Sequence, residues 1–132
     1  MNAMSAIKEY SAIDKKALIE EASPHRLIAL LLSTLKQRVQ QARHGLERQD
    51  AAATGTHLSK ALDILSYLTV CVEPQPGATE ISDNLRSLYS YMERRILEAN
   101  RSRNGSILLE VTELIGELEE GWVNSSMDNG HG

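Results

Sequence analysis

The placement of proline is the strongest constraint on how this chain can fold. Its three prolines stand at positions 24, 74 and 76, so the long stretches 25–73 and 77–132 contain none. Because proline breaks a helix interior, its absence leaves both stretches free to be helical. Within them apolar residues recur at every third or fourth position, without the alternation typical of strands. These patterns predict an all-α fold.

Capping residues and helix breakers predict where the helices begin and end. Ser23 followed by Pro24 is a strong start signal, because the serine side chain accepts a free first-turn N–H and proline suits the first helical position. Asp50 is a candidate cap for the next helix, and Asn104 or Ser106 can cap the last one. With loops at 73–79 and 100–105, the sequence predicts four long helices at residues 24–47, 51–72, 80–99 and 106–122.

Short loops between helices of similar length predict antiparallel neighbours. The expected architecture is therefore an antiparallel up-down four-helix bundle with a short extra N-terminal helix at 14–22 and a lead segment at 1–13 laid against it. We predict a single domain over 1–123. The small, polar tail at 124–132 is expected to be disordered.

Charge and cysteine usage exclude several classes of function. The net charge is −4, with 14 Lys and Arg against 18 Asp and Glu, which does not fit a nucleic-acid-binding protein. Cys71 is the single cysteine, and no Cys/His cluster has metal-ligand spacing. The chain shows neither a signal peptide nor an apolar run long enough to span a bilayer. We expect a cytoplasmic protein with no membrane insertion, no catalytic or metal-binding residue and no cofactor.

One stretch resembles an enzymatic motif. Thr56-His57-Leu58-Ser59-Lys60-Ala61 is similar to the phospho-accepting stretch of histidine phosphotransfer domains, where a lysine three residues after the histidine offsets the phosphoryl charge. Those domains then have glycine, and this chain has Ala61. A histidine phosphotransfer bundle using His57 is one alternative, and an ordinary exposed histidine near a helix end is the other.

Three of the predicted helices carry apolar residues beyond the stripe that a bundle core needs. In the fourth long helix that core stripe is predicted to be Ile81, Leu85, Leu88, Met92, Ile96 and Ala99. Contiguous surplus apolar residues mark a partner-binding groove, which an apolar segment of another protein would fill. The lead segment would cover the groove in the absence of a partner. The predicted partner-binding residues are Met4, Ile7, Tyr10, Leu27, Leu30, Ile64, Tyr67, Cys71, Tyr89, Tyr91 and Leu97.

Several stretches resemble the FliS family of flagellar secretion chaperones. They are Ala22-Ser-Pro-His-Arg-Leu-Ile, Leu58-Ser-Lys-Ala-Leu-Asp-Ile, Leu88-Tyr-Ser-Tyr-Met-Glu-Arg-Arg-Ile-Leu-Glu-Ala-Asn, and the closing Glu120-Gly-Trp. The resemblance implies a helical-bundle chaperone that binds the C-terminal segment of flagellin. It would prevent premature polymerisation and assist delivery to the flagellar type III export apparatus, and an N-terminal segment would cover part of the client surface.

The chain departs from the family's habits at a few positions. The family usually has glycine before the aspartate at position 50, where this chain has Gln49, and aspartate between the two tyrosines, where it has Ser90. These departures leave open which flagellin, or which other secreted client, is bound by such a helical adaptor. A homodimer in the absence of client is also left open.

Overall fold

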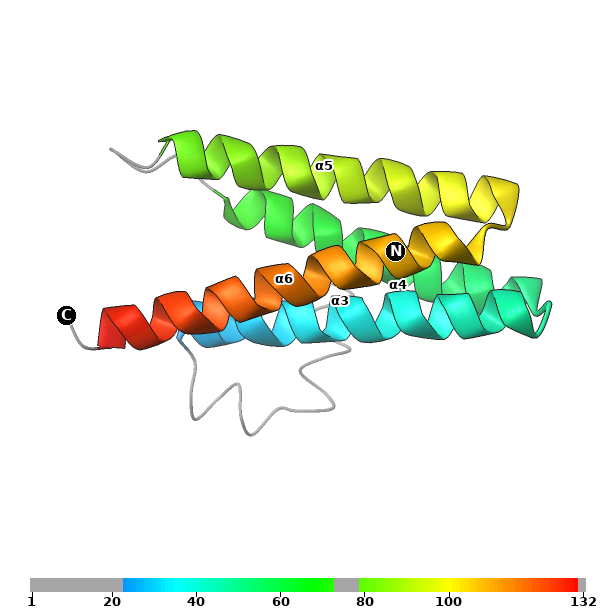
Figure 1. Ribbon diagram of the computed structural model, residues 1–132, viewed down its shortest axis with the longest axis horizontal. Helices are drawn as coiled ribbons and strands as arrows, with labels where there is room; N and C mark the ends of the chain where they lie inside the picture. The colour runs from blue at the N-terminus through cyan, green and yellow to red at the C-terminus, as the bar shows by residue number, and fades with distance from the viewer. Residues whose placement is uncertain (1–22, 73–78, 131–132) are drawn as a thin grey trace.

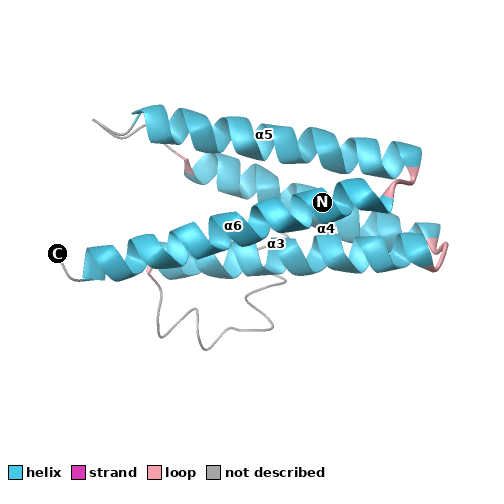
Figure 2. Ribbon diagram, viewed as in Figure 1, coloured by secondary structure: helices cyan, strands magenta, loops and turns pink. Residues whose placement is uncertain are grey.

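A computed structural model describes residues 23–72 and 79–130 as four α-helices. They are α3 (Pro24–Glu47), α4 (Ala51–Cys71), α5 (Thr79–Ser102) and α6 (Gly105–Gly130), labelled as in Figure 1. Figure 2 shows that the described chain is helical apart from short turns. The predicted all-α four-helix bundle is confirmed. The predicted helix 14–22 and lead 1–13 lie outside the described residues.

The start of each helix follows the predicted capping chemistry where it can be checked. Ser23 Oγ accepts the Arg26 N–H at 3.1 Å, and Asp50 Oδ1 accepts the Ala53 N–H at 3.0 Å. Asn104 Oδ1 accepts the Ser106 N–H at 3.0 Å at the start of α6. Each bond satisfies a first-turn donor that has no partner within its own helix.

The end of α6 differs from the prediction. The helix continues through Gly130, whereas the sequence predicted a disordered tail from residue 124. No proline interrupts this stretch. Because each further residue of a nucleated helix adds one hydrogen bond, a polar stretch without proline can prolong an existing helix.

Both helix–helix corners are built in the same way. At the end of α3 the Asp50 N–H donates to the Gly45 carbonyl at 2.9 Å, with Gln49 in the left-handed region at φ 58°. At the end of α5 the Asn104 N–H donates to the Ala99 carbonyl at 3.1 Å, with Arg103 at φ 55°. These are Schellman motifs, and the residue that closes each one also caps the next helix. Each turn is therefore short, because one residue both closes the first helix and caps the next.

Gly45 brings α3 and α4 into close contact beside their corner. A Cβ atom at position 45 would lie 2.5 Å from Thr54 Oγ1 and 3.2 Å from the Thr54 backbone nitrogen. Thr54 is fully buried, and its hydroxyl donates to the Asp50 carbonyl at 2.8 Å. A larger residue at position 45 would overlap this threonine, so the close approach depends on glycine.

The core is a single cluster of apolar side chains from all four helices, and it corrects two predictions. Ile64 is 2% exposed, so it belongs to the core instead of standing outside it. Tyr89 is 5% exposed and belongs to the core while also lining a pocket. Ile81 was predicted to be buried but is 66% exposed. Its spacing places it on the same helix face as the core residues of α5. It lies in the first turns of α5, however, where Figure 1 shows α5 diverging from α6.

The helices pair differently at the two ends of the bundle. At one end the corners join α3 to α4 and α5 to α6. At the other end α3 is tied to α6 by His25 and Trp122, and Arg86 of α5 donates to the Val72 carbonyl after α4. Figure 1 shows α4 and α5 separated from α3 and α6 at this second end. We call it the open end; the end with both corners is the corner end.

Two polar contacts join α6 to its neighbours along the bundle. Glu110 accepts from the Tyr91 hydroxyl at 2.7 Å and from Arg95 Nε at 2.9 Å, both on α5. Lys36 of α3 pairs with Glu119 at 2.5 Å. The hydrogen bond from Tyr91 and the neighbouring Arg95 hold the pKa of Glu110 below its usual value.

The Gly45 contact leads to a stability prediction. Gly45→Ala should lower the free energy of unfolding by about 1–3 kcal/mol, because the new methyl group forces α3 and α4 apart. Gly116→Ala is the matched control, since nothing lies within 4 Å of a Cβ there, and alanine in a helix interior should raise stability by about 0.5–1 kcal/mol. Urea unfolding of both variants checks this. A loss at position 116 equal to that at 45 would contradict the steric explanation.

The Glu110 contact leads to a prediction about pH. The folded-state pKa of this carboxyl is lowered, so its contribution to stability is complete above the unfolded pKa of about 4.3 and disappears as pH falls through the folded value. Glu110→Gln should therefore be less stable than the parent at pH 7, and the difference should shrink when unfolding is measured at pH 3. Glu113→Gln, an exposed neighbour on α6, should match the parent at both pH values.

Candidate functional site

An apolar pocket of about 450 Å³ opens between the helices at the open end of the bundle. All four helices contribute to it, because α3 and α6 stand apart from α4 and α5 there. The lining residues are Pro24, His25, Leu27, Ile28, Tyr67, Leu68, Cys71, Val72, Ser82, Leu85, Tyr89 and Trp122. Most are apolar or aromatic, so the pocket suits apolar side chains of a bound segment.

One wall of the pocket is fixed by a clasp between His25 and Trp122. The His25 Nε2 donates to the Trp122 carbonyl at 3.1 Å, and the Trp122 indole N–H donates to the His25 carbonyl at 2.9 Å. The two rings stack with centroids 4.3 Å apart and planes 15° from parallel. This reciprocal pair joins residues 97 positions apart and holds the last predicted core residue of α6 against the first turn of α3.

Two tyrosines, Tyr67 of α4 and Tyr89 of α5, line the pocket wall that these two helices form. Burial raises the pKa of Tyr89 to about 12, and burial together with a hydrogen bond to Cys71 raises the pKa of Tyr67. Both phenols are therefore neutral at physiological pH and can donate a hydrogen bond. A bound segment would meet an apolar surface with hydrogen-bonding hydroxyls.

The pocket brings together four of the residues predicted from sequence, namely Leu27, Tyr67, Cys71 and Tyr89. Leu30 is half-buried outside the pocket lining, and Ile64 is in the core. Tyr91 lies at the α5–α6 contact with Glu110, and Leu97 is 51% exposed. Neither lines the pocket. The predicted residues Met4, Ile7 and Tyr10 lie outside the described residues.

Sequence reasoning missed the pocket residues that sit on the core stripes. Leu85 was predicted as core, and Ile28 and Trp122 were not among the predicted site residues; each of the three is only partly buried because the helices separate at this end. Their position at the ends of core stripes was the available signal. Periodicity shows which way a side chain faces, but it does not show whether another helix lies opposite.

His57 has a structural contact that bears on the phosphotransfer alternative. The Arg38 guanidinium of α3 donates to His57 Nδ1 at 3.0 Å. In the neutral ring the proton is then on Nε2. The geometry favours a role for His57 in joining α3 to α4.

Among the described residues, no three His, Cys, Asp or Glu side chains come together as a metal site would require. None of the helices in residues 23–72 and 79–130 is long and apolar enough to cross a membrane.

Comparison with known proteins identifies the family. A family model described as flagellar protein FliS matches residues 6–129. The flagellar secretion chaperone FliSB of Pseudomonas aeruginosa is 38% identical over 122 residues, covering 92% of this chain and 96% of that protein. The flagellar secretion chaperone FliS of Salmonella typhimurium is 35% identical over 126 residues, covering 96% of this chain and 93% of that protein. With this coverage and the helical bundle described above, the chain belongs to the FliS family of flagellar secretion chaperones.

Proposed function

We propose that this flagellar export chaperone acts in the cytoplasm by binding the C-terminal segment of flagellin. Binding would keep that segment from polymerising early and present it to the flagellar type III export apparatus. The observation that carries the proposal is the apolar pocket at the open end, because a pocket of this composition needs an apolar occupant. Family membership supplies the class of client, since relatives are flagellar secretion chaperones.

Binding of this kind would be driven mainly by the burial of apolar surface. Each Å² of apolar surface removed from water contributes about 25 cal/mol, before the cost of ordering the client segment. The neutral hydroxyls of Tyr67 and Tyr89 would donate hydrogen bonds to the segment's backbone or side chains. Nothing in this mechanism calls for ATP, a metal ion or a cofactor, and we propose that the protein is not an enzyme.

The lead segment enters the proposal as a competitor for the pocket. Met4, Ile7 and Tyr10 carry apolar side chains at a three-residue spacing, which would let one edge of the segment lie on an apolar surface. We propose that this edge covers the client site until the client arrives, and that an uncovered site can pair two copies of the chain.

The pocket assignment is tested by two neighbouring substitutions on α4. Cys71 lines the pocket and Val70 does not, although both side chains are exposed. Cys71→Asp should weaken binding of the C-terminal flagellin segment at least ten-fold, or about 1.4 kcal/mol, because a carboxylate would face the apolar occupant. Val70→Asp adds the same charge one residue away and should change binding less than two-fold.

Isothermal titration calorimetry with the flagellin encoded in the same genome measures both variants. Apolar burial should give a negative heat-capacity change on binding. If the segment does not bind at micromolar concentration, the client assignment fails. If Cys71→Asp and Val70→Asp weaken binding equally, the pocket is not the site. Ile64→Asp is unsuitable for this purpose, because Ile64 is in the core and its loss would unfold the bundle.

Removal of residues 1–13 tests the lead segment. If the lead covers the site, the shortened chain should bind the flagellin segment several-fold more tightly and should show more dimer by sedimentation velocity. Unchanged affinity and unchanged mass would contradict the covering role. The assignment of the pocket as the client site would still be tested separately by the substitutions on α4.

A further inference from the structure

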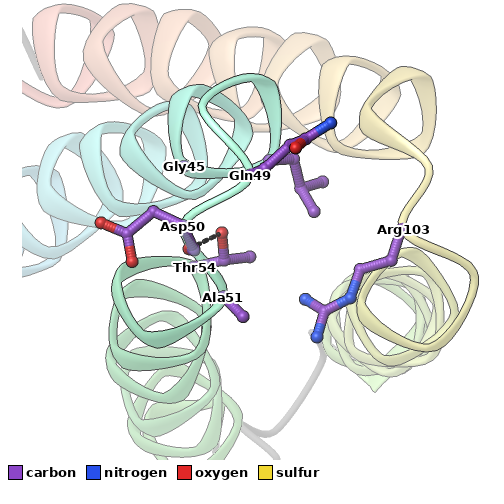
Figure 3. A pocket seen from close by; sticks show the side chains of 7 residues that line it. Gly45, Gln49, Asp50, Ala51, Thr54 and Arg103 are labelled. Carbon is purple, nitrogen blue, oxygen red and sulfur yellow. Dashed lines mark hydrogen bonds between the residues drawn. The ribbon is translucent and has the colours of Figure 1, made fainter.

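The corner end of the bundle holds a second pocket, of about 380 Å³, whose character is different. It lies between the α3–α4 corner and the α5–α6 corner, and Figure 3 shows its lining side chains. The α3–α4 side consists largely of small residues such as Gly45, Ala51 and Thr54. Arg103 enters from the opposite corner and extends its guanidinium toward Ala51. The pocket is thus a small cleft with a cationic group at one wall.

Two lining residues hold a backbone conformation that side chains disfavour. Gln49 and Arg103, at φ 58° and 55°, are the only non-glycine residues with positive φ among residues 23–72 and 79–130, and both line this pocket. Glycine would make either turn at lower cost in free energy. Non-glycine residues in this region often mark functional sites, where the side chain serves a purpose that offsets the strain.

Arg103 and Asp50 are the charged residues that line the pocket. The Arg103 side chain donates to the neutral Asn100 Oδ1 at 3.2 Å, and no ion pair to Arg103 or Arg48 is found within the described chain. The Asp50 carboxylate is used to cap α4 and points away from the pocket in Figure 3. A chain with a net charge of −4 therefore presents unpaired guanidinium groups at this end.

We propose that the pocket at the corner end binds a carboxylate of a partner polypeptide. Arg103 would hold the carboxylate through its paired N–H donors. The volume suits one or two side chains, so the ligand is an Asp or Glu side chain or a peptide C-terminus. This site lies at the opposite end of helices about 36 Å long, so it can be occupied while the apolar pocket holds a client. The proposal does not depend on the identity of that client.

The test uses the full chain and three short acetylated peptides of equal length. The first carries two glutamates and an amidated end, the second has glutamines in their place, and the third has its C-terminal carboxylate as its single acid. Amide shifts in ¹H–¹⁵N spectra at constant ionic strength should move saturably around Ala51, Thr54 and Arg103, with a dissociation constant below about 1 mM. The glutamine peptide should leave them unmoved, and the first and third peptides distinguish a side-chain acid from a chain end.

Matched variants separate a specific site from general charge attraction. Arg103→Gln should raise the dissociation constant at least ten-fold. Arg94→Gln removes the same charge from an exposed position on α5, where the side chain bonds only to Ser90 in the described structure, and should change binding less than two-fold. Arg103→Gly should abolish binding and raise the thermal midpoint, because glycine relieves the positive-φ strain.

Several results would overturn the proposal. One is the absence of saturable shifts with either acidic peptide. Another is equal weakening by Arg94→Gln and Arg103→Gln, which would indicate non-specific attraction. A third is a lower thermal midpoint for Arg103→Gly, which would remove the argument from strain. Titration of each variant with the flagellin segment shows separately whether the client site is intact.

Discussion

The contact between Gly45 and Thr54 sets the shape of the bundle. It allows α3 and α4 to meet almost backbone to backbone beside their corner. Helices that meet this closely at one end and carry larger side chains toward the other must diverge along their length. The divergence places the apolar pocket at the open end, where Leu27 of α3 and Tyr67 of α4 line it. A small residue at one end of the molecule thus creates the binding space at the other.

The helix boundaries were predictable from sequence because the residues that cap the helices act locally. Ser23, Asp50 and Asn104 act within three residues of themselves, so capping chemistry can be read without knowing the fold. The errors in predicted burial arose where burial depends on how the helices pack against one another. Ile64 is buried by neighbours that periodicity does not reveal, and Ile81 faces the core direction at a point where the helices have separated. The extent of α6 was missed because a polar sequence carries no signal for continuation.

The candidate site was predictable only in part, for a related reason. Surplus apolar residues such as Tyr67 and Cys71 stand out in a helical pattern and were found. His25 and Trp122 were not among the predicted site residues, and their pairing across 97 positions follows from the three-dimensional arrangement alone. A binding site at the end of a bundle, where the helices separate, is lined by the same apolar residue types as the core. Its sequence pattern is therefore nearly the same as that of the core.

The His25–Trp122 clasp also has a consequence for synthesis of the chain. One wall of the apolar pocket comes from the first turn of α3 and another from the last core turn of α6. A ribosome must therefore release nearly the entire domain before the pocket exists at all. A nascent chain still lacking Trp122 lacks one side of the candidate site. That site is thus completed late and in one step, when the domain itself is finished.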